Sequence, residues 1–329
     1  KKILKVSVVC PFFNEEDIIT ASIKRMYRNL DNQFEDWELI LVNDGSKDNS
    51  FKEAKYVSKE LSEKIKVISC HRNQGRGRAL KNGINFAVGD IIVTTEADCS
   101  WGDNIAKRLV DYLLINDLDV VVASPHAKKG KFINVPLKRV LITKIGNFLI
   151  NIFFSSGVSM NTGMTRAYKK EVIQPLVCFE NGKEFHLEVL LKLKTLNFRI
   201  DEIPAVLEWK DHKLSKTSKK KSRKSSTNLL KTIYTHFRFL AIAQPRMNFT
   251  LASLFTSGIG FLVLIWAFRN LITGNPSLFL AILSLQLLLF SLIFIGFAVL
   301  FDQFREVLRE KWMNYYKGKK PPSALNAQE

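Results

Sequence analysis

The sequence predicts an α/β domain with a largely parallel sheet, followed by a pair of membrane-spanning helices. Three observations lead to this fold class. Short β-branched runs alternate with helical patterns over roughly the first 200 residues, which is typical of βαβ units. Two long stretches in the last third carry no charged residue, and a strongly basic segment separates them from the α/β part.

Five strands are expected in the α/β part, each a run of β-branched and aliphatic residues. In parallel sheets of this kind, ligands bind beyond the carboxyl ends of the strands. The residues that follow each run are therefore the candidates for function. The runs are residues 6–9, 39–42, 65–68, 91–93 and 120–122.

Polar residues follow three of these runs. Segment 11–16 (PFFNEE) comes after the first run and segment 43–46 (NDGS) after the second, where Asp44 offers a carboxylate to a base or ribose. Glu96 and Asp98 follow the fourth run, and two carboxylates at this spacing can converge on Mg²⁺ or Mn²⁺. Any one of these motifs could be an ordinary turn, because Asp and Asn often end strands where the chain turns. Their occurrence at three strand ends favours a common site.

Residues 71–79 (HRNQGRGRA) form a basic, glycine-rich segment between the third and fourth runs. Two glycines let a backbone approach a ligand closely, and arginines such as Arg76 suit a diphosphate. The segment matches neither a Walker nor a Rossmann pattern. A basic surface turn explains the same residues when they are taken alone.

The composition narrows the class of protein further. Of 329 residues, 47% are hydrophobic and 24% are charged, which excludes a disordered chain. The four cysteines lie far apart without a CxxC pair, which fits a reducing compartment and argues against a disulfide framework or zinc site. Residues 1–5 lead straight into a strand-like run, so no signal peptide is expected.

Residues 247–268 and 277–301 are each uncharged and long enough to cross the hydrocarbon layer as a helix. Buried core helices are the alternative, but soluble cores rarely contain two consecutive helices that are apolar all round. The loop between the stretches has one basic residue, Arg269, whereas several flank their outer ends. The positive-inside bias then predicts a two-span, multi-pass hairpin, with domain 1–209, tail 302–329 and both termini in the cytoplasm.

Segment 210–246 holds much of the net charge of +18, with eleven Lys and Arg and one acid. An anionic lipid surface, a nucleic acid or a phosphorylated substrate could be the partner. Residues 229–243 repeat apolar side chains at helical spacing, which predicts an amphipathic helix on the membrane, with a packing helix as the alternative. Residues 213–226 contain no aromatic side chain for base stacking, so we expect membrane lipid and no nucleic acid.

In their order and spacing, these motifs resemble family 2 glycosyltransferases of the dolichyl-phosphate mannose or glucose synthase type. The resemblance covers roughly residues 5–240 and rests on SVVCPFFNEE, LVNDGSKDNS, NQGRGRALKNG, TTEADCSW, the helix PLKRVLITKIGN, and LSK at 214–216. It implies a GT-A fold, a Mg²⁺ or Mn²⁺ cofactor, and transfer of a hexose from a nucleotide-diphosphate sugar to dolichyl or polyprenyl phosphate. The NQGRG form favours a UDP-glucose-type donor over GDP-mannose.

The resemblance also implies roles for single residues. The nucleotide sugar is expected at Pro11, Phe13, Glu15, Asp44, Arg76 and Ala97, and the metal at Glu96 and Asp98, where Glu replaces the usual first Asp. The acceptor phosphate is expected at Arg139, Thr143, Ser215 and Lys216. Asp98, Arg139, Lys216 and Glu188 are expected to serve catalysis. A lipid phosphate is already anionic near neutral pH, so charge neutralisation suffices, and direct in-line attack predicts inversion.

The chain departs from this family pattern at three places. Pro125 stands where the family has an arginine, and the segment from His126 to Lys129 offers replacements. Lys213 replaces the glycine of an Arg-x-x-Gly-x-Ser-Lys motif, and Asn161, near a family aspartate, cannot act as a base. Two alternatives therefore remain. The chain could be a membrane glycosyltransferase with another sugar or lipid acceptor, or a catalytically silent membrane scaffold. The hairpin could also join copies into a homo-oligomer.

Overall fold

The computed structural model describes residues 3–154, 157–209 and 245–317, which divide between two compact units. The first unit contains the α/β domain, and the second contains the two long C-terminal helices. The basic loop with Ser215 and Lys216, and the amphipathic helix expected at 229–243, lie outside the described residues.

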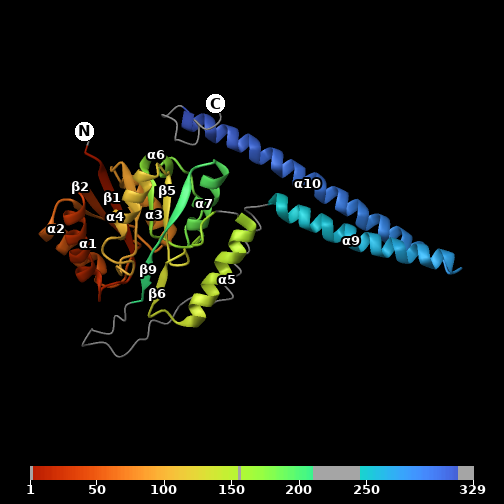
Figure 1. Ribbon diagram of the computed structural model, residues 1–329, viewed down its shortest axis with the longest axis horizontal. Helices are drawn as coiled ribbons and strands as arrows, with labels where there is room; N and C mark the ends of the chain where they lie inside the picture. Colours follow the sequence, from red (N-terminus) through yellow and green to blue (C-terminus); the bar gives the residue numbers. More distant parts are fainter. Residues whose placement is uncertain (1–2, 155–156, 210–244, 318–329) are drawn as a thin grey trace. The chain divides into compact units, whose positions relative to one another are not determined.

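A seven-stranded mixed sheet forms the centre of the α/β unit, with the strand order β3-β2-β1-β4-β7-β5-β8 (Figure 1). The strands β3, β2, β1 and β4 pair in parallel. All five expected strands are present, which confirms this part of the fold. They are β1 (Lys5–Phe12), β2 (Asp36–Asn43), β3 (Ile65–Ser69), β4 (Ile91–Thr94) and β5 (Val120–Ser124).

Four further strands were not expected from the sequence. β7 (Arg166–Lys169) runs antiparallel between β4 and β5, and β8 (Ile200–Pro204) pairs in parallel with β5. β6 (Lys131–Ile133) and β9 (Val206–Glu208) form a small second sheet. β7 reads RAYK, so it lacks the apolar run that marks a central strand. In this sheet β7 alone runs against the other six strands, so the sheet is mixed but largely parallel, as the sequence predicts.

Helices connect the strands and cover the sheet (Figure 1). Most lie where the sequence alternates between strand and helical patterns. They are α1 (Ile19–Gln33), α2 (Ser50–Leu61), α3 (Arg76–Phe86), α4 (Ile105–Ile115), α5 (Leu137–Phe154), α6 (Lys170–Ile173) and α7 (Phe185–Thr195).

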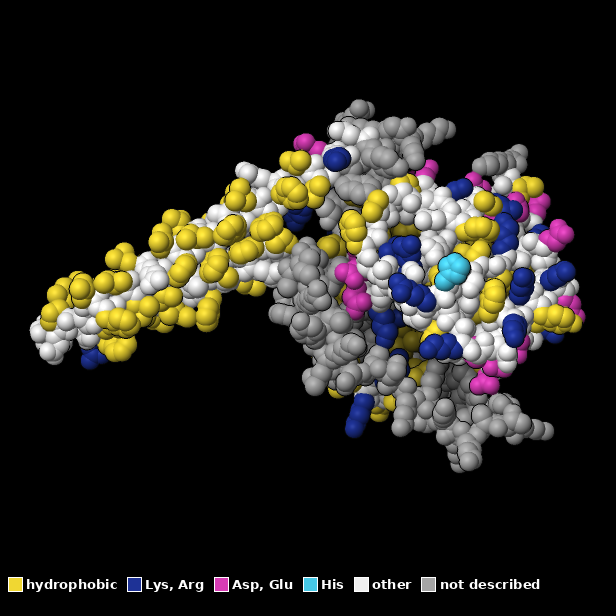
Figure 2. All heavy atoms as spheres, turned by 180° about the vertical axis from the view of Figure 1, so that it is seen from behind, with side chains coloured by type: hydrophobic (Ala, Val, Ile, Leu, Met, Phe, Trp, Pro, Cys, Tyr) yellow, Lys and Arg dark blue, Asp and Glu magenta, His cyan; other side chains and the backbone are white. Residues whose placement is uncertain are grey.

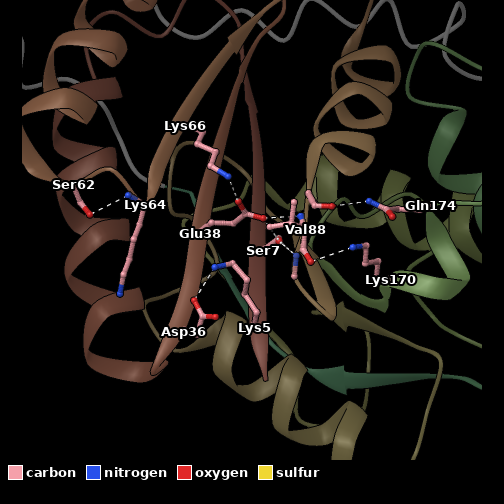
Figure 3. Close-up of polar contacts among 12 residues, drawn as sticks. Lys5, Ser7, Asp36, Glu38, Ser62, Lys64, Lys66, Val88, Lys170 and Gln174 are labelled. Carbon is pink, nitrogen blue, oxygen red and sulfur yellow. Dashed lines mark hydrogen bonds and ion pairs between the residues drawn. The ribbon is translucent and has the colours of Figure 1, made fainter. Parts of the chain in front are cut away.

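A buried carboxylate joins the strands at the amino end of the sheet (Figure 3). Glu38 is 2% exposed and accepts hydrogen bonds from Ser7 Oγ at 2.6 Å, Lys66 Nζ at 2.7 Å and the Val88 amide at 2.8 Å. Burial alone raises the pKa of Glu38, but the bonds from Lys66, Ser7 and Val88 outweigh it and leave the pKa below its usual value. Ser7 lies early in β1, so this cluster is remote from the carboxyl ends of the strands and stabilises the fold.

The second unit is a hairpin of α9 (Pro245–Ile272) and α10 (Leu278–Lys317). With 28 and 40 residues, the helices are about 42 and 60 Å long, enough to cross a bilayer. α9 contains the expected span 247–268, and α10 covers the expected span 277–301 except for its first residue and continues into the expected tail. Large apolar side chains cover the hairpin surface in Figure 2. Such a surface needs an apolar environment.

Small residues bring α9 and α10 together. The hydroxyls of Ser253 and Ser291 lie 2.9 Å apart in the buried interface. A Cβ on Gly260 would lie 3.1 Å from Leu288 Cδ2, so glycine permits the close approach. Close contact at small residues is typical of helix pairs within membranes.

Candidate active site

Two carboxylates lie just beyond the carboxyl end of β4, near the middle of the sheet. Glu96 accepts hydrogen bonds from Ser100 Oγ at 3.1 Å and Trp101 Nε1 at 3.2 Å, and Arg76 Nη1 lies 3.6 Å from its Oε1. Asp98 Oδ1 accepts a bond from the Ser100 amide at 3.1 Å. Burial raises the pKa of Glu96, and the charge of Asp98 raises it further. A cation between the two carboxylates would relieve this repulsion.

The donor set fits a hard divalent cation that also binds substrate oxygens. In the part of the chain that the structure describes, no group of three or more His, Cys, Asp or Glu could hold a metal. Glu96 and Asp98 would therefore be the protein ligands there, with phosphate and water oxygens completing the shell. Mg²⁺ is commonly held by one or two carboxylates plus substrate phosphates.

The residues expected at the nucleotide meet at the ends of β1 and β2. Pro11 is buried, whereas Phe13 is 37% exposed. Asn14 connects the two segments, because its amide donates to Ser46 Oγ at 3.0 Å and its Oδ1 accepts from the Lys47 amide at 2.8 Å. The segments 11–16 and 43–46 thus form one continuous wall.

Asp44 and Glu15 complete this wall beside the acidic pair. Asp44 is buried, and its Oδ1 accepts a hydrogen bond from the Gln74 amide at 3.0 Å. Burial raises the pKa of Asp44, against lowering bonds from the Gln74 and Gly75 amides. Burial also raises the pKa of the Cys10 thiol, and the charges of Cys99, Asp98, Glu15 and Glu96 raise it further. The Glu15 amide donates to Ser50 Oγ at 2.8 Å, which connects segment 11–16 to the start of α2. Ala97, between the two acids, is buried.

The two glycines of segment 71–79 allow another segment of the same chain to pack closely against them. Gly75 has φ +99°, and a Cβ there would lie 2.6 Å from the carbonyl oxygen of Asn181. A Cβ on Gly77 would lie 2.7 Å from Gly182 O and from Phe185 Cβ. The expected reason for these glycines was the approach of a ligand. The structure shows instead that residues 177–184, which we call the 177–184 loop, pack against them.

Glu188 fixes the 177–184 loop. This α7 side chain is 5% exposed, and its carboxylate accepts bonds from the amides of Phe179 at 2.9 Å and Glu180 at 2.8 Å. Lys192 Nζ lies 2.6 Å from Glu188 Oε1. All of these partners belong to the loop or to α7. The catalytic role expected for Glu188 stays a prediction, and the contacts indicate an indirect one.

Arg139 and Thr143 lie one turn apart on α5, as expected. The Arg139 guanidinium lies 4.5 Å from the centre of the Trp209 ring, and Thr143 Oγ1 donates to the Arg139 carbonyl at 2.7 Å. Burial lowers the pKa of Lys183, and the nearby charges of Arg76 and Arg139 lower it further. Lys183 thus lies within electrostatic range of both arginines, and we call Arg76, Arg139 and Lys183 the basic cluster. Neither Lys183 nor Trp209 has a local sequence signal, because each comes from a segment distant in the chain.

The other face of α5 is not packed against the described residues. The sequence predicts an apolar stripe at helical spacing on this face, with a packing role, at Leu137, Leu141, Ile145, Phe148 and Ile152. Four of these side chains are instead exposed, by 50–85%, at Leu137, Leu141, Ile145 and Phe148. The stripe needs another apolar environment.

The segment around Pro125 provides no replacement arginine close to the sheet. Pro125 is buried after β5, and His126 packs edge-on against Phe132 with ring centres 4.9 Å apart. Burial lowers the pKa of His126, and the charge of Lys144 lowers it further, so His126 is neutral near pH 7. Lys128 and its neighbour 129 are exposed.

Most expected site residues of the α/β unit thus gather at one edge of the sheet. Those at the ends of β1, β2 and β4 lie with Arg76, and Arg139 and Thr143 lie on α5. The donor role expected for the first group and the acceptor role expected for the second stay predictions; below, the first group is called the donor side and the second the acceptor side. Ser215 and Lys216 cannot be placed, because they lie outside the described residues. A pair of acids beside a cluster of cations can hold a metal-bound diphosphate and a second anion.

Comparisons with known proteins show the family of the chain. Residues 7–176 match the profile described as "Glycosyl transferase family 2". The undecaprenyl-phosphate 4-deoxy-4-formamido-L-arabinose transferase of Proteus mirabilis is 29% identical over 55% of this chain and 54% of its own length. The dolichol-phosphate mannosyltransferase of Pyrococcus furiosus is 26% identical over 82% of this chain and 73% of its own length. The chain thus spans about half the length of the Proteus protein.

A solved structure confirms the fold class. Glucosyl-3-phosphoglycerate synthase from Mycobacterium tuberculosis, crystallised with uridine diphosphate, superposes with a TM-score of 0.53. The two chains are 18% identical, and the match covers 73% of this chain and 80% of the other. The α/β unit has the expected GT-A architecture.

Proposed function

Because the chain belongs to glycosyl transferase family 2, we propose that it transfers a hexose from a nucleotide-diphosphate sugar to a polyprenyl phosphate, with inversion. The observation that carries this proposal is the meeting of an acidic pair, Glu96 and Asp98, with a basic cluster of Arg76, Arg139 and Lys183. One anion, a metal-bound diphosphate, suits the acids. The basic cluster extends past that position to α5, where a second anion fits.

The names of the relatives support a lipid phosphate as the second anion. The Proteus and Pyrococcus proteins are named for undecaprenyl phosphate and dolichol phosphate. For the donor we propose a UDP-glucose-type sugar rather than GDP-mannose, on the form of the NQGRG segment.

The reaction needs electrostatic stabilisation more than proton transfer. A phosphate oxygen of the acceptor attacks the anomeric carbon, and the bond from that carbon to the diphosphate oxygen breaks. Glu96 and Asp98 would hold Mg²⁺ or Mn²⁺, which supplies positive charge for the diphosphate. Arg76 and Lys183 offset the remaining charge on the donor side, and Arg139 fixes the acceptor phosphate. The nucleoside diphosphate leaves from the opposite face of the sugar, so the anomeric configuration inverts once.

A membrane location fits both units. We propose that α9 and α10 cross the bilayer once each, with both outer ends in the cytoplasm and the α/β unit on that side. The exposed stripe of α5 can lie in the lipid interface, where Lys138 and Lys144 of the same helix would meet anionic head groups. We also propose that α9 and α10 form contacts between copies of the chain in a homo-oligomer.

The test is transfer by the purified full chain from a panel of radiolabelled nucleotide sugars to polyprenyl phosphate. We expect Asp98→Asn to abolish transfer while the protein still folds and inserts, since this half-buried carboxylate at a strand end supplies charge and not packing. Asp111→Asn, which changes an α4 carboxylate paired with Lys107, is the control and should transfer normally. Near-normal turnover by Asp98→Asn without added divalent cation would refute the metal site. Failure of the wild-type chain with every donor would refute the proposed reaction.

A further inference from the structure

A buried amide joins α5 to the chain that follows it. Asn147, on α5, is 4% exposed, and its Nδ2 donates to the Thr143 carbonyl at 2.9 Å. Its Oδ1 accepts a hydrogen bond from the Asn161 amide at 2.8 Å. Asn161 is 1% exposed, and its own Nδ2 donates to Asn151 Oδ1 on α5 at 2.8 Å. Asn161 is therefore hydrogen-bonded to two successive turns of α5.

A buried arginine continues this connection on β7. Arg166 is fully buried, and its Nη2 donates to the Asn161 carbonyl at 2.6 Å. Its Nη1 donates to the carbonyl of His186, in the first turn of α7, at 3.0 Å. One rigid guanidinium thus joins two segments that are 25 positions apart in the chain, residues 161 and 186.

This arginine is costly to bury. Among the described residues it makes no salt bridge, and its Nε has no hydrogen-bond partner. Burial lowers the pKa of Arg166, with Tyr168 acting in the opposite direction. A buried cation without a carboxylate partner contributes little to stability, because its desolvation is not fully compensated. A role in geometry explains its presence better than a role in stability.

The two ends of the connection reach the two sides of the candidate site. On α5, the next hydrogen bond runs from Thr143 Oγ1 to the carbonyl of Arg139, at 2.7 Å. On α7, Phe185 precedes His186, and its Cβ lies 2.7 Å from the position that a Cβ on Gly77 would occupy. Gly77 follows Arg76 on the donor side.

We propose that Asn147 and Arg166 are positioning residues, which hold the Arg139 turn of α5 at a fixed place relative to the donor loop around Gly77. The inference rests on the proposed function, because it assigns Arg139 to the acceptor phosphate. In-line attack needs the acceptor oxygen close to the anomeric carbon and aligned with the bond that breaks. A misplacement of about 1 Å can cost roughly 100-fold in rate.

A double-mutant cycle with the full chain tests this role. Asn147→Leu keeps the branched shape of the side chain but removes its hydrogen bonds to Thr143 and Asn161. Arg139→Ala removes the group to be positioned. We expect Asn147→Leu alone to lower kcat/KM for polyprenyl phosphate roughly 10- to 100-fold. Calorimetric affinity for the nucleotide sugar should change less than about twofold. In the Arg139→Ala background, Asn147→Leu should have almost no further effect, because its target is gone.

Gln174→Leu is the matched control. The Gln174 amide also joins two segments, with bonds from Nε2 to the carbonyls of Ile84 at 2.8 Å and Ala87 at 2.7 Å. Gln174 lies outside the site. We therefore expect Gln174→Leu to lose about as much thermal stability as Asn147→Leu does, without loss of kcat/KM for the acceptor. Arg166→Lys, which retains the charge but cannot bridge two carbonyls in the same way, should lower acceptor use as Asn147→Leu does.

The outcomes separate this inference from the proposed function. If the wild-type chain transfers sugar but the effects of Asn147→Leu and Arg139→Ala multiply, Asn147 does not act through Arg139 and the inference is overturned. An equal loss of kcat/KM for polyprenyl phosphate in Gln174→Leu would also overturn the inference, because it would show that destabilising the fold anywhere lowers activity. No transfer by wild type would overturn the proposed function instead.

Discussion

The exposed stripe of α5 permits a quantitative prediction about membrane contact. Leu141, Ile145 and Phe148 are 59%, 50% and 63% exposed. At about 2 kcal/mol for complete burial of a large apolar side chain, covering these exposed parts is worth about 3 kcal/mol. Replacing all three by serine should therefore weaken binding to a lipid interface roughly 100-fold.

The hairpin must be absent for this effect to be measured. A chain cut after Pro245 lacks α9, α10 and the tail. We expect it to bind vesicles of anionic phospholipid in a flotation assay, and to use a short, water-soluble prenyl phosphate. It should lose most activity on long lipid in bilayers. The triple serine variant of this chain should bind the vesicles roughly 100-fold more weakly but retain affinity for the nucleotide sugar.

Ile115→Ser is the control, because Ile115 on α4 is 82% exposed but lies outside the stripe. It should bind vesicles as the parent does. Equal vesicle binding by the triple variant and its parent would refute a membrane role for α5. Full activity of the truncated chain on long lipid in bilayers would show that the hairpin does not deliver the acceptor, which would leave assembly as its role.

Three further predictions follow from single side chains. Arg139→Ala, like Lys216→Ala, should weaken use of the lipid acceptor more than calorimetric binding of the nucleotide sugar; equal losses would assign both residues to the donor or the fold. Glu188→Gln should cost about 2 kcal/mol of stability in urea unfolding and speed hydrogen exchange at the 177–184 loop, because it weakens charge-assisted bonds to two amides; unchanged exchange would contradict this role. The native pKa of Glu38 is lowered, so its stabilising contribution is complete above the unfolded value of about 4.3 and is lost as pH falls through the native value. Wild type should therefore lose stability below about pH 5 more steeply than Glu38→Gln, and parallel pH profiles would contradict the assignment.

The sequence was most informative about features that depend on neighbouring residues and on the order of strands and helices. Apolar runs gave the five strands, and the rule that ligands meet strand ends brought Asp44, Glu96 and Asp98 to one edge without knowledge of tertiary contacts. β7 could not be predicted, because Arg166 and its neighbours look like a surface segment. Their burial depends on partners contributed by distant parts of the chain.

Other features of the site depend on long-range packing in the same way. The glycine at 77 looks like a ligand-binding position, yet the group that approaches it is the 177–184 loop. The apolar stripe on α5 has the periodicity of a core helix, and periodicity cannot say whether protein or lipid covers a face. Lys183 and Trp209 join Arg139 only when the chain has folded.

The length of α10 has a mechanical consequence. The hydrocarbon layer is about 30 Å thick, and the helix is about twice as long. Residues 302–317 continue it for about 24 Å without a break. If α10 crosses the bilayer as proposed, it would work as a lever, since a tilt of the part inside the bilayer would swing the outer end through a proportionate arc. Changes in bilayer thickness would thereby become displacements of the charged outer segment.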